Sequence, residues 1–452
     1  MHKFKIFKRF LIVAMAWLAL PAGAQTGNDT ATVKKNELSI DFQFMGRGES
    51  RYGGIDVDEI DPFDEEAEDP KPGKSSFVLS RLRLPINYRR DWLEARVTAQ
   101  HSGVWGQEGK GSFNLYESWV KLTSRQGLFA QLGRVALSYD DGRIIGTDDW
   151  AMAALSHDVL RLGYEGHGHK AHAILAYNQN AEVMTTGYSQ YRYGAQPYKT
   201  MHTLWYHYDV GRFPLGISAL FMNIGMQSTK DDMLDKTIFQ HLLGGYLSFN
   251  PMKWSLSASY YHQFGHNENN MKIDAWMASA KATFKPSTLY SITAGYDFLS
   301  GDKQFAVPSA GQIGMSQHKV IKGFSTVYGS HHQFYGAMDF FYVSTYVNGF
   351  TPGLQNTYIG AQVSPVKGLD LSASYHYLAT ATHLEDKDMT LGHEVELQAS
   401  YAIARDVRIS LGGSFMHGGK TMESLKRLTK DSTLRWGWIS LNVNPRIFST
   451  KW

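Results

Sequence analysis

Polar and apolar residues alternate along several stretches of this chain, and this period of two limits the fold more than any other feature. In residues 254–261 the even positions are apolar or aromatic, while serine occupies three successive odd positions. Residues 290–298, 369–377 and 407–415 repeat the pattern. Successive side chains of a β-strand point to opposite faces, so each stretch predicts a strand with one apolar and one polar face.

The first 24 residues are of a different kind. Basic residues precede an uninterrupted apolar run from Phe10 to Leu20, and Ala22-Gly23-Ala24 follows it. This order predicts a secretory signal peptide that is cleaved after Ala24, and its apolar run is too short to span a bilayer as a helix. We therefore expect a signal peptide at residues 1–24 and one domain at residues 25–452.

Composition excludes several classes of protein. Removing the four basic residues of the signal peptide from the 45 in the chain leaves 41 basic against 42 acidic residues, a net charge of about −1. Such a balance gives no overall field that would attract nucleic acid. The chain has no cysteine, which excludes disulfides and thiolate metal sites. After residue 24 no apolar run is long enough for a transmembrane helix.

The connections distinguish a membrane barrel from a soluble β-sandwich, which would also alternate. Eight short connections alternate with nine longer, more polar ones, the largest running roughly from Asp302 to Gly353. This order is typical of outer-membrane barrels, which have short periplasmic turns and long external loops, and it implies about 18 strands with both termini in the periplasm. The short connections are 89–91, 125–127, 165–170, 211–214, 250–252, 285–288, 365–368 and 404–406.

The predicted fold is therefore all-β, a transmembrane antiparallel up-and-down β-barrel. Closure removes the sheet edges, as burial in a bilayer requires. At ~10 residues per tilted strand, the strands use under half of the mature chain and leave the rest for loops. The alternatives are a secreted β-sandwich and a β-helical array, and no repeat of fixed length supports the second.

One block of sequence resembles a known family. Gly133-Arg134 is followed by Tyr139-Asp-Asp-Gly-Arg143, by Trp150 and by residues 157–161. This block is similar to the alginate-export family of bacterial outer-membrane β-barrels. Residues 295–302 and, more weakly, residues 328–339 extend the resemblance. It implies an outer-membrane channel, and the founding kind exports the polyanion alginate through a pore lined with arginine.

Charged residues of the expected strands fall on the polar face, which would line the lumen. Arg81 and Arg83 alternate with Leu82 and Leu84. A lipid-facing arginine at the bilayer midplane would cost roughly 2–4 kcal/mol, so both arginines are expected to point inward. The same parity places five more charged residues inward: Glu94, Arg96, Glu117, Lys121 and Arg161. The alternative is that such charges only solvate the lumen and brace its wall.

The stretch from Tyr139 to Trp150 falls in a long external connection. Its Asp-Asp-Gly-Arg turn favours a tight local fold. We hypothesise that this loop bends into the barrel and sets the constriction, with a structural role against the wall as the alternative. Three arginines would then face three carboxylates: Arg134, Arg143 and Arg161 opposite Asp140, Asp141 and Asp158.

Later strands depart from a uniformly basic lumen. Parity places four further carboxylates inward: Asp297, Asp370, Glu394 and Glu396. A polyuronate would meet like charge there, so the resemblance does not assign alginate as the substrate. Hydrophilic solutes, including anions and saccharides, are the expected class.

Two other clusters carry residue types that can bind ions. The first external loop, from Asp56 to Asp69, holds nine carboxylates, and such charge runs are usually solvated. A calcium or magnesium bridge to lipopolysaccharide phosphates is the alternative, although the loop lacks EF-hand spacing. Histidines at 167, 169, 172, 331 and 332 lack a partner ligand at a recognisable spacing and are interpreted as surface residues. No metal or cofactor is expected.

The sequence also lacks the Gly-x-Ser-x-Gly, His-Glu-x-x-His and P-loop motifs of enzymes. A Ser–His pair assembled across strands, from His376 and the neighbours of Ser374, is the remaining enzymatic alternative. The expected function is a passive outer-membrane channel in contact with membrane lipid and lipopolysaccharide, and a periplasmic partner is left open. The alternative is an adhesin or structural barrel whose loop from Asp302 to Gly353 plugs the lumen.

Overall fold

The computed structural model describes the chain in ten segments. The predicted signal peptide and the acidic loop from Asp56 to Asp69 lie outside them. Among the described residues, none of the helices combines the length and apolar composition that crossing a membrane requires. The described segments are 36–55, 72–107, 109, 111–178, 198–229, 236–302, 320–343, 351–384, 387–426 and 433–452.

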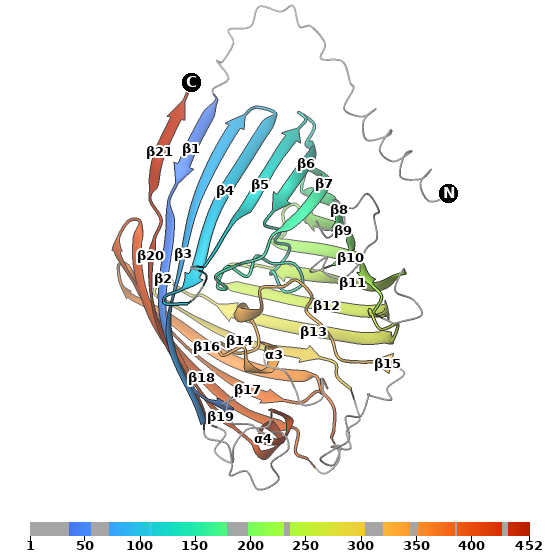
Figure 1. Ribbon diagram of the computed structural model, residues 1–452, viewed down its shortest axis with the longest axis vertical. Helices are drawn as coiled ribbons and strands as arrows, with labels where there is room; N and C mark the ends of the chain where they lie inside the picture. Colours follow the sequence, from blue (N-terminus) through green and yellow to red (C-terminus); the bar gives the residue numbers. More distant parts are fainter. Residues whose placement is uncertain are drawn as a thin grey trace, which may run out of the picture. The chain divides into compact units, whose positions relative to one another are not determined.

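Eighteen antiparallel strands close into a barrel, which confirms the predicted fold (Figure 1). Two wall strands are interrupted by short breaks: β1 (Glu37–Asp41) continues as β2 (Gln43–Ile55), and β20 (Thr433–Val443) continues as β21 (Arg446–Lys451). The first wall strand, β1 with β2, is hydrogen-bonded both to the last wall strand, β20 with β21, and to β3. No sheet edge therefore remains in the wall. The other wall strands are β3 (Pro72–Arg90), β4 (Leu93–Val104), β5 (Ser112–Thr123), β6 (Leu128–Val135), β7 (His157–Gly166), β8 (His169–Tyr177), β9 (Thr200–Asp209), β10 (Leu215–Gln227), β11 (Thr237–Phe249), β12 (Trp254–His266), β13 (Lys272–Phe284), β14 (Tyr290–Leu299), β16 (Leu354–Val366), β17 (Leu369–Ala379), β18 (Thr390–Ala404) and β19 (Val407–Gly418).

The eight short connections lie where they were predicted, between paired neighbours at one rim of the barrel. The first and last strands meet at this same rim, because Glu37 pairs with both Lys451 and Arg89. Short turns face the periplasm in outer-membrane barrels. The opposite rim, where the long connections lie, therefore faces outward from the cell. The small elements of the long connections are β15 (Val320–Ile321), a 3₁₀ turn (His331–Gln333), α3 (Phe340–Val343) and α4 (Lys420–Lys426).

The alternation in sequence separates two faces of the wall. Leu132, Leu397 and Leu411 lie on the outer face and are more than half exposed, as expected of side chains that contact lipid. On the inner face of β12 and β13, Ser259 and Ser279 are hydrogen-bonded to each other at 2.7 Å. The period of two thus supplies both the apolar band and the polar interior.

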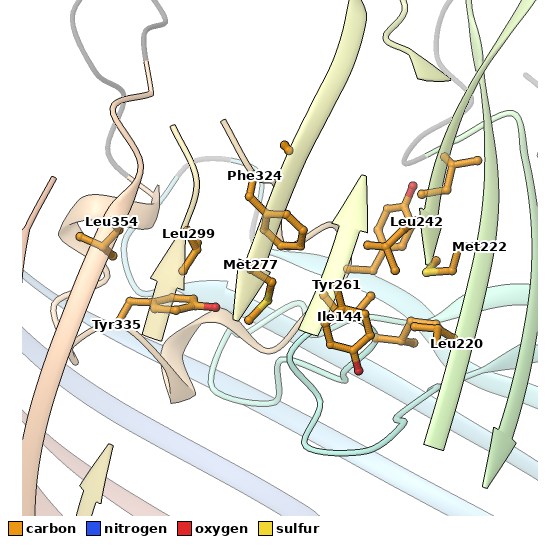
Figure 2. Close-up of a cluster of buried hydrophobic side chains, with 14 of the residues drawn as sticks. Ile144, Leu220, Met222, Leu242, Tyr261, Met277, Leu299, Phe324, Tyr335 and Leu354 are labelled. Carbon is orange, nitrogen blue, oxygen red and sulfur yellow. The ribbon is translucent and has the colours of Figure 1, made fainter. Parts of the chain in front are cut away.

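Part of the inner face is apolar, however, and this corrects the expectation of a uniformly polar interior. Two external connections fold into the barrel: inner loop A, residues 136–156, between β6 and β7, and inner loop B, residues 322–343, between β14 and β16 (Figure 1). Their apolar side chains pack on inward side chains of β9 to β14 and β16, as Figure 2 shows for Ile144 and Tyr335. The wall residues labelled there are Leu220, Met222, Leu242, Tyr261, Met277, Leu299 and Leu354. Burying each such side chain contributes roughly 1.5–3 kcal/mol.

The two inner loops are also bonded to each other. Tyr328 of inner loop B accepts a backbone hydrogen bond from Gly146 at 2.9 Å and donates one to Ile144 at 3.1 Å. Ser330 donates its amide to the carbonyl of Gly142 at 2.9 Å. A Cβ atom at residue 146 would lie 2.6 Å from that carbonyl oxygen, so glycine is needed for this close approach. The loops therefore form one unit inside the barrel.

Candidate functional site

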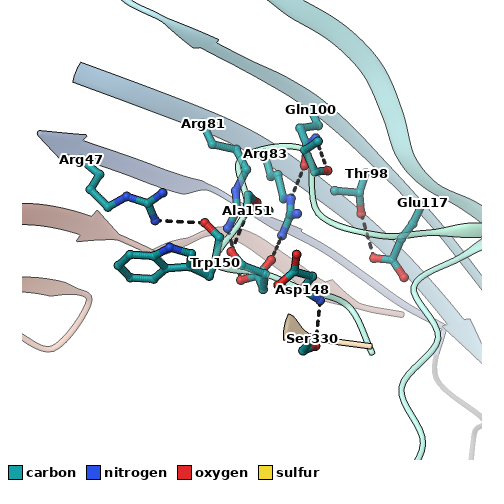
Figure 3. Close-up of polar contacts among 12 residues, drawn as sticks. Arg47, Arg81, Arg83, Thr98, Gln100, Glu117, Asp148, Trp150, Ala151 and Ser330 are labelled. Carbon is teal, nitrogen blue, oxygen red and sulfur yellow. Dashed lines mark hydrogen bonds and ion pairs between the residues drawn. The ribbon is translucent and has the colours of Figure 1, made fainter. Parts of the chain in front are cut away.

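Arg81 and Arg83 lie on the inner face of β3 and bind the tip of inner loop A (Figure 3). Arg81 donates through Nη1 to the carbonyl oxygens of Asp149, at 2.9 Å, and Ala151, at 3.1 Å. The Asp149 carboxylate accepts from Arg81 at 3.2 Å and from Arg83 at 2.6 Å. Arg83 also donates to the Gln100 amide oxygen at 2.6 Å. One exposed loop carboxylate is thus held by two buried arginines.

Arg47 on β2 is a third inward arginine that binds this tip, and the sequence pattern did not indicate it. Its Nη1 donates to the carbonyl oxygen of Trp150 at 3.0 Å, and its guanidinium lies 3.8 Å from the centre of that indole ring. Glu49 pairs with Arg47 at 2.8 Å and accepts from the indole nitrogen of Trp436 at 2.9 Å. The loop tip is therefore fixed by charged side chains from β2 and β3.

Arg143 fixes the other side of inner loop A. Its guanidinium lies 3.3 Å from Asp141, 3.0 Å from the Tyr335 hydroxyl and 3.1 Å from Asp297 on β14. Arg143 and Asp297 are almost wholly buried, at 3% and 1% exposure. Burial opposes the charged form, but the nearby Tyr335, Asp297 and Asp141 outweigh it and raise the pKa of Arg143 above its ordinary value. A charged cluster therefore joins loop A, loop B and the wall.

The remaining inward charges lie on β4, β5 and β7. Arg96 and Glu117 form an ion pair at 2.7 Å. Lys121 and Arg161 both lie over the ring of Phe129, at 4.5 and 5.2 Å, and Arg161 donates to the Tyr139 hydroxyl at 3.4 Å. Glu94 lies on β4 opposite Arg89 and Lys121 in the strand register. Asp140 accepts from the Trp205 indole at 3.2 Å, so its partner differs from the arginine that we expected.

The structure corrects the placement of Arg134 and Asp158. They form a two-point ion pair, at 2.8 and 2.9 Å, on the outer face of the wall near the external rim. Arg134 is two residues from Leu132, and Asp158 is two residues from Leu160, so parity gives both the outward direction of those leucines. They do not face the carboxylates Asp140 and Asp141 across a constriction.

Inner loop B is held by carboxylates of β18. Glu396 accepts from the amide of Ala337 at 2.6 Å, and Glu394 accepts from that of Met338 at 3.0 Å. On the loop, His332 stacks on Trp150 with ring centres 4.1 Å apart and contacts Asp339 at 2.8 Å. In the described segments, no three His, Asp or Glu side chains are grouped to hold a metal ion.

Helix α4 reaches inner loop B through a buried lysine. Lys426 donates to the carbonyl oxygen of Phe340 at 3.1 Å and lies over the Phe340 ring. Burial lowers the pKa of Lys426 to about 7, against about 10.4 for an exposed lysine. Between these values the docked helix binds fewer protons than the undocked helix, so docking strengthens as pH rises.

We therefore expect hydrogen exchange of the α4 amides to slow between about pH 7 and about pH 9, after correction for the intrinsic rate. The Lys426→Met variant removes the titrating group and should show a flat corrected profile. An equal pH dependence in the Met variant would contradict this assignment.

Comparison with known proteins agrees with this geometry. The family model described as Alginate export matches residues 95–431, more than half of the chain. Among solved structures, Pseudomonas aeruginosa OpdL has a TM-score of 0.59 at 12% identity and covers 91% of this chain and 99% of its own. OccK2 (OpdF) from the same organism has a TM-score of 0.59 at 11% identity, covering 91% and 98%. No curated protein sequence matches. The chain belongs to the alginate export family and is an outer-membrane β-barrel channel.

Proposed function

We propose that this channel passes hydrophilic solutes passively, through a charged lumen that inner loops A and B narrow. The observation that carries the proposal is the set of charged anchors at both ends of the loop unit: Arg47, Arg81 and Arg83 on one side of the barrel, and Asp297, Glu394 and Glu396 on the other. Loops held in this way narrow the interior of a barrel. They do so without a plugging helix or a separate plug domain. Passage then depends on size and charge at the loop unit.

Whether the channel prefers anions or cations depends on the inward charged side chains that do not hold the inner loops. Arg81 and Arg83 are buried against Asp149, whereas Arg96 keeps about a third of its side chain exposed. With Lys121 and Arg161, it gives the inner face of β4, β5 and β7 three cations against the two carboxylates Glu94 and Glu117, a strip of net positive charge. We propose that this strip favours anionic over cationic solutes.

Reversal potentials in a planar bilayer test this proposal. With a salt gradient, the wild type is expected to prefer anions, and the Lys121→Gln/Arg161→Gln variant is expected to lose most of that preference with little change in conductance. Arg408→Gln is a matched control, since this arginine lies on β19 and pairs with Asp370 at 3.1 Å. A protein that conducts no ions would favour the alternative, a plugged barrel that binds a partner through its loops.

A further inference from the structure

We propose that a cavity beside inner loops A and B is a binding subsite for one neutral sugar ring. The inference rests on the proposed function, because the site lies in the proposed path. The cavity has a volume of about 320 Å³ and lies between the loops and strands β17 to β20. Its lining includes Trp436, Trp438, His332, Glu396, Gln398 and Ser372.

An aromatic wall forms one side of this subsite. Trp438 covers Gly412 of the neighbouring strand, since a Cβ atom there would lie 2.6 to 3.0 Å from three atoms of the indole. The missing Cβ lets the ring lie on the sheet, where Trp150 of inner loop A packs against it with ring centres 5.1 Å apart, and both indoles line the cavity. Trp436 is 5.8 Å from Trp150, ring centre to ring centre, and its nitrogen is held by Glu49. The aromatic surface is therefore preorganised.

Polar groups form the other side. Glu396 is fixed by the amide of Ala337 at 2.6 Å, the hydroxyl of Ser374 at 2.5 Å and His376 at 3.3 Å. A carboxylate offers about four acceptor positions, so Glu396 retains capacity for a hydroxyl donor. Gln398 and Ser372 add donors and acceptors to the lining. An apolar platform beside a few fixed polar groups suits a pyranose, whose C–H face is apolar and whose edge carries hydroxyls.

Charge decides which class of sugar fits. The lining of this cavity, as far as the described residues form it, includes the carboxylate of Glu396 and no arginine or lysine. Arg47 lies near Trp150 but pairs with Glu49. A uronate would bring its carboxylate close to Glu396 in a site of reduced dielectric, and like charges repel strongly there. The subsite is therefore suited to a neutral sugar and excludes the repeating unit of a polyuronate.

Calorimetric titration of the full-length protein in detergent tests the subsite without requiring ion flow. The probes are a neutral glucose oligosaccharide and a uronate oligosaccharide of equal length. We expect the neutral probe to bind at least about tenfold more tightly, and Trp438→Ala to weaken it by at least about tenfold. Trp254→Ala, on the outer face of β12, is the matched control and should bind as the wild type does.

A second variant tests the subsite independently, in case Trp438→Ala does not fold. Gly412→Ala keeps every polar group and places a methyl group 2.6 Å from the indole, so it should weaken neutral-sugar binding through displacement of Trp438. Equal or tighter binding of the uronate probe, or unchanged affinity in both variants, would overturn the subsite. Conductance is measured separately. If the protein conducts ions but binds no neutral sugar, only the subsite is disproved. If it binds the neutral sugar but conducts no ions, only the proposed channel function is disproved.

Discussion

Replacing Arg81 and Arg83 with alanine is expected to raise single-channel conductance and open-channel noise, because both side chains hold the tip of inner loop A. Together they donate to the Asp149 carboxylate and to two backbone carbonyl oxygens. A hydrogen bond that involves a charged group contributes about 1.5–3 kcal/mol. Asp149 is 57% exposed, so solvent screening reduces this gain, and we expect a combined loss of about 2–4 kcal/mol in anchoring. Recordings in planar bilayers measure the change.

The Asp149→Asn variant separates loop release from the loss of wall charge. Asp149→Asn removes the two ion pairs but keeps the hydrogen bonds from Arg81 to the backbone carbonyls of residues 149 and 151, so it should raise conductance by less than the arginine replacements do. The arginine replacements make the lumen more negative, whereas Asp149→Asn makes it more positive, so their reversal potentials should shift in opposite directions. Arg408→Ala removes an inward arginine whose partner is Asp370, away from inner loop A, and should leave conductance close to that of the wild type. Unchanged conductance in both anchor variants would show that the loop does not narrow the path.

Strand positions followed from the sequence wherever a wall strand has lipid on one face and a polar interior on the other. The alternation of residues 254–261 and the tight turns at 250–252 and 285–288 predicted β12 and β13 with their directions. Parity also gave the inward direction of Arg81 and Arg83. It failed for Arg47, because the outward positions beside it are Gly46 and Gly48, which carry no apolar signal.

The inner loops could not be placed in this way. Inward Met222 and Leu242 alternate with outward Phe221 and Leu243, so both faces of these strands are apolar and the period of two disappears. The partners of these inward residues lie far away in the sequence, in residues 136–156 and 322–343. Glu394 and Glu396 were assigned to the inner face, but their partners on inner loop B are backbone amides, which no side-chain pattern indicates. Contacts of this kind require the folded chain.

Replacing Arg143 with alanine is expected to lower the free energy of unfolding by about 3–5 kcal/mol, the usual loss when one partner of a buried ion pair is removed. Asp297, at 1% exposure, would then be left in the interior without its cation. The contact with the Tyr335 hydroxyl would also be lost, so inner loops A and B would loosen together. Denaturant titration of the protein in micelles, followed by tryptophan fluorescence, measures the loss.

Two further variants distinguish lost pairing from lost packing at this position. Asp297→Asn leaves Arg143 with Asp141 and Tyr335, so its loss of stability should be the smaller one. The double variant Arg143→Met/Asp297→Asn removes both charges of the most deeply buried pair and should recover part of what Arg143→Ala loses, because only Asp141 is then left without its cation. A double variant no more stable than Arg143→Ala would assign the effect to packing of the guanidinium on Phe334, which lies 4.0 Å away. In either case, the rigidity of the loop unit, and with it the width of the path, depends on a cluster remote from the Arg81 and Arg83 anchors.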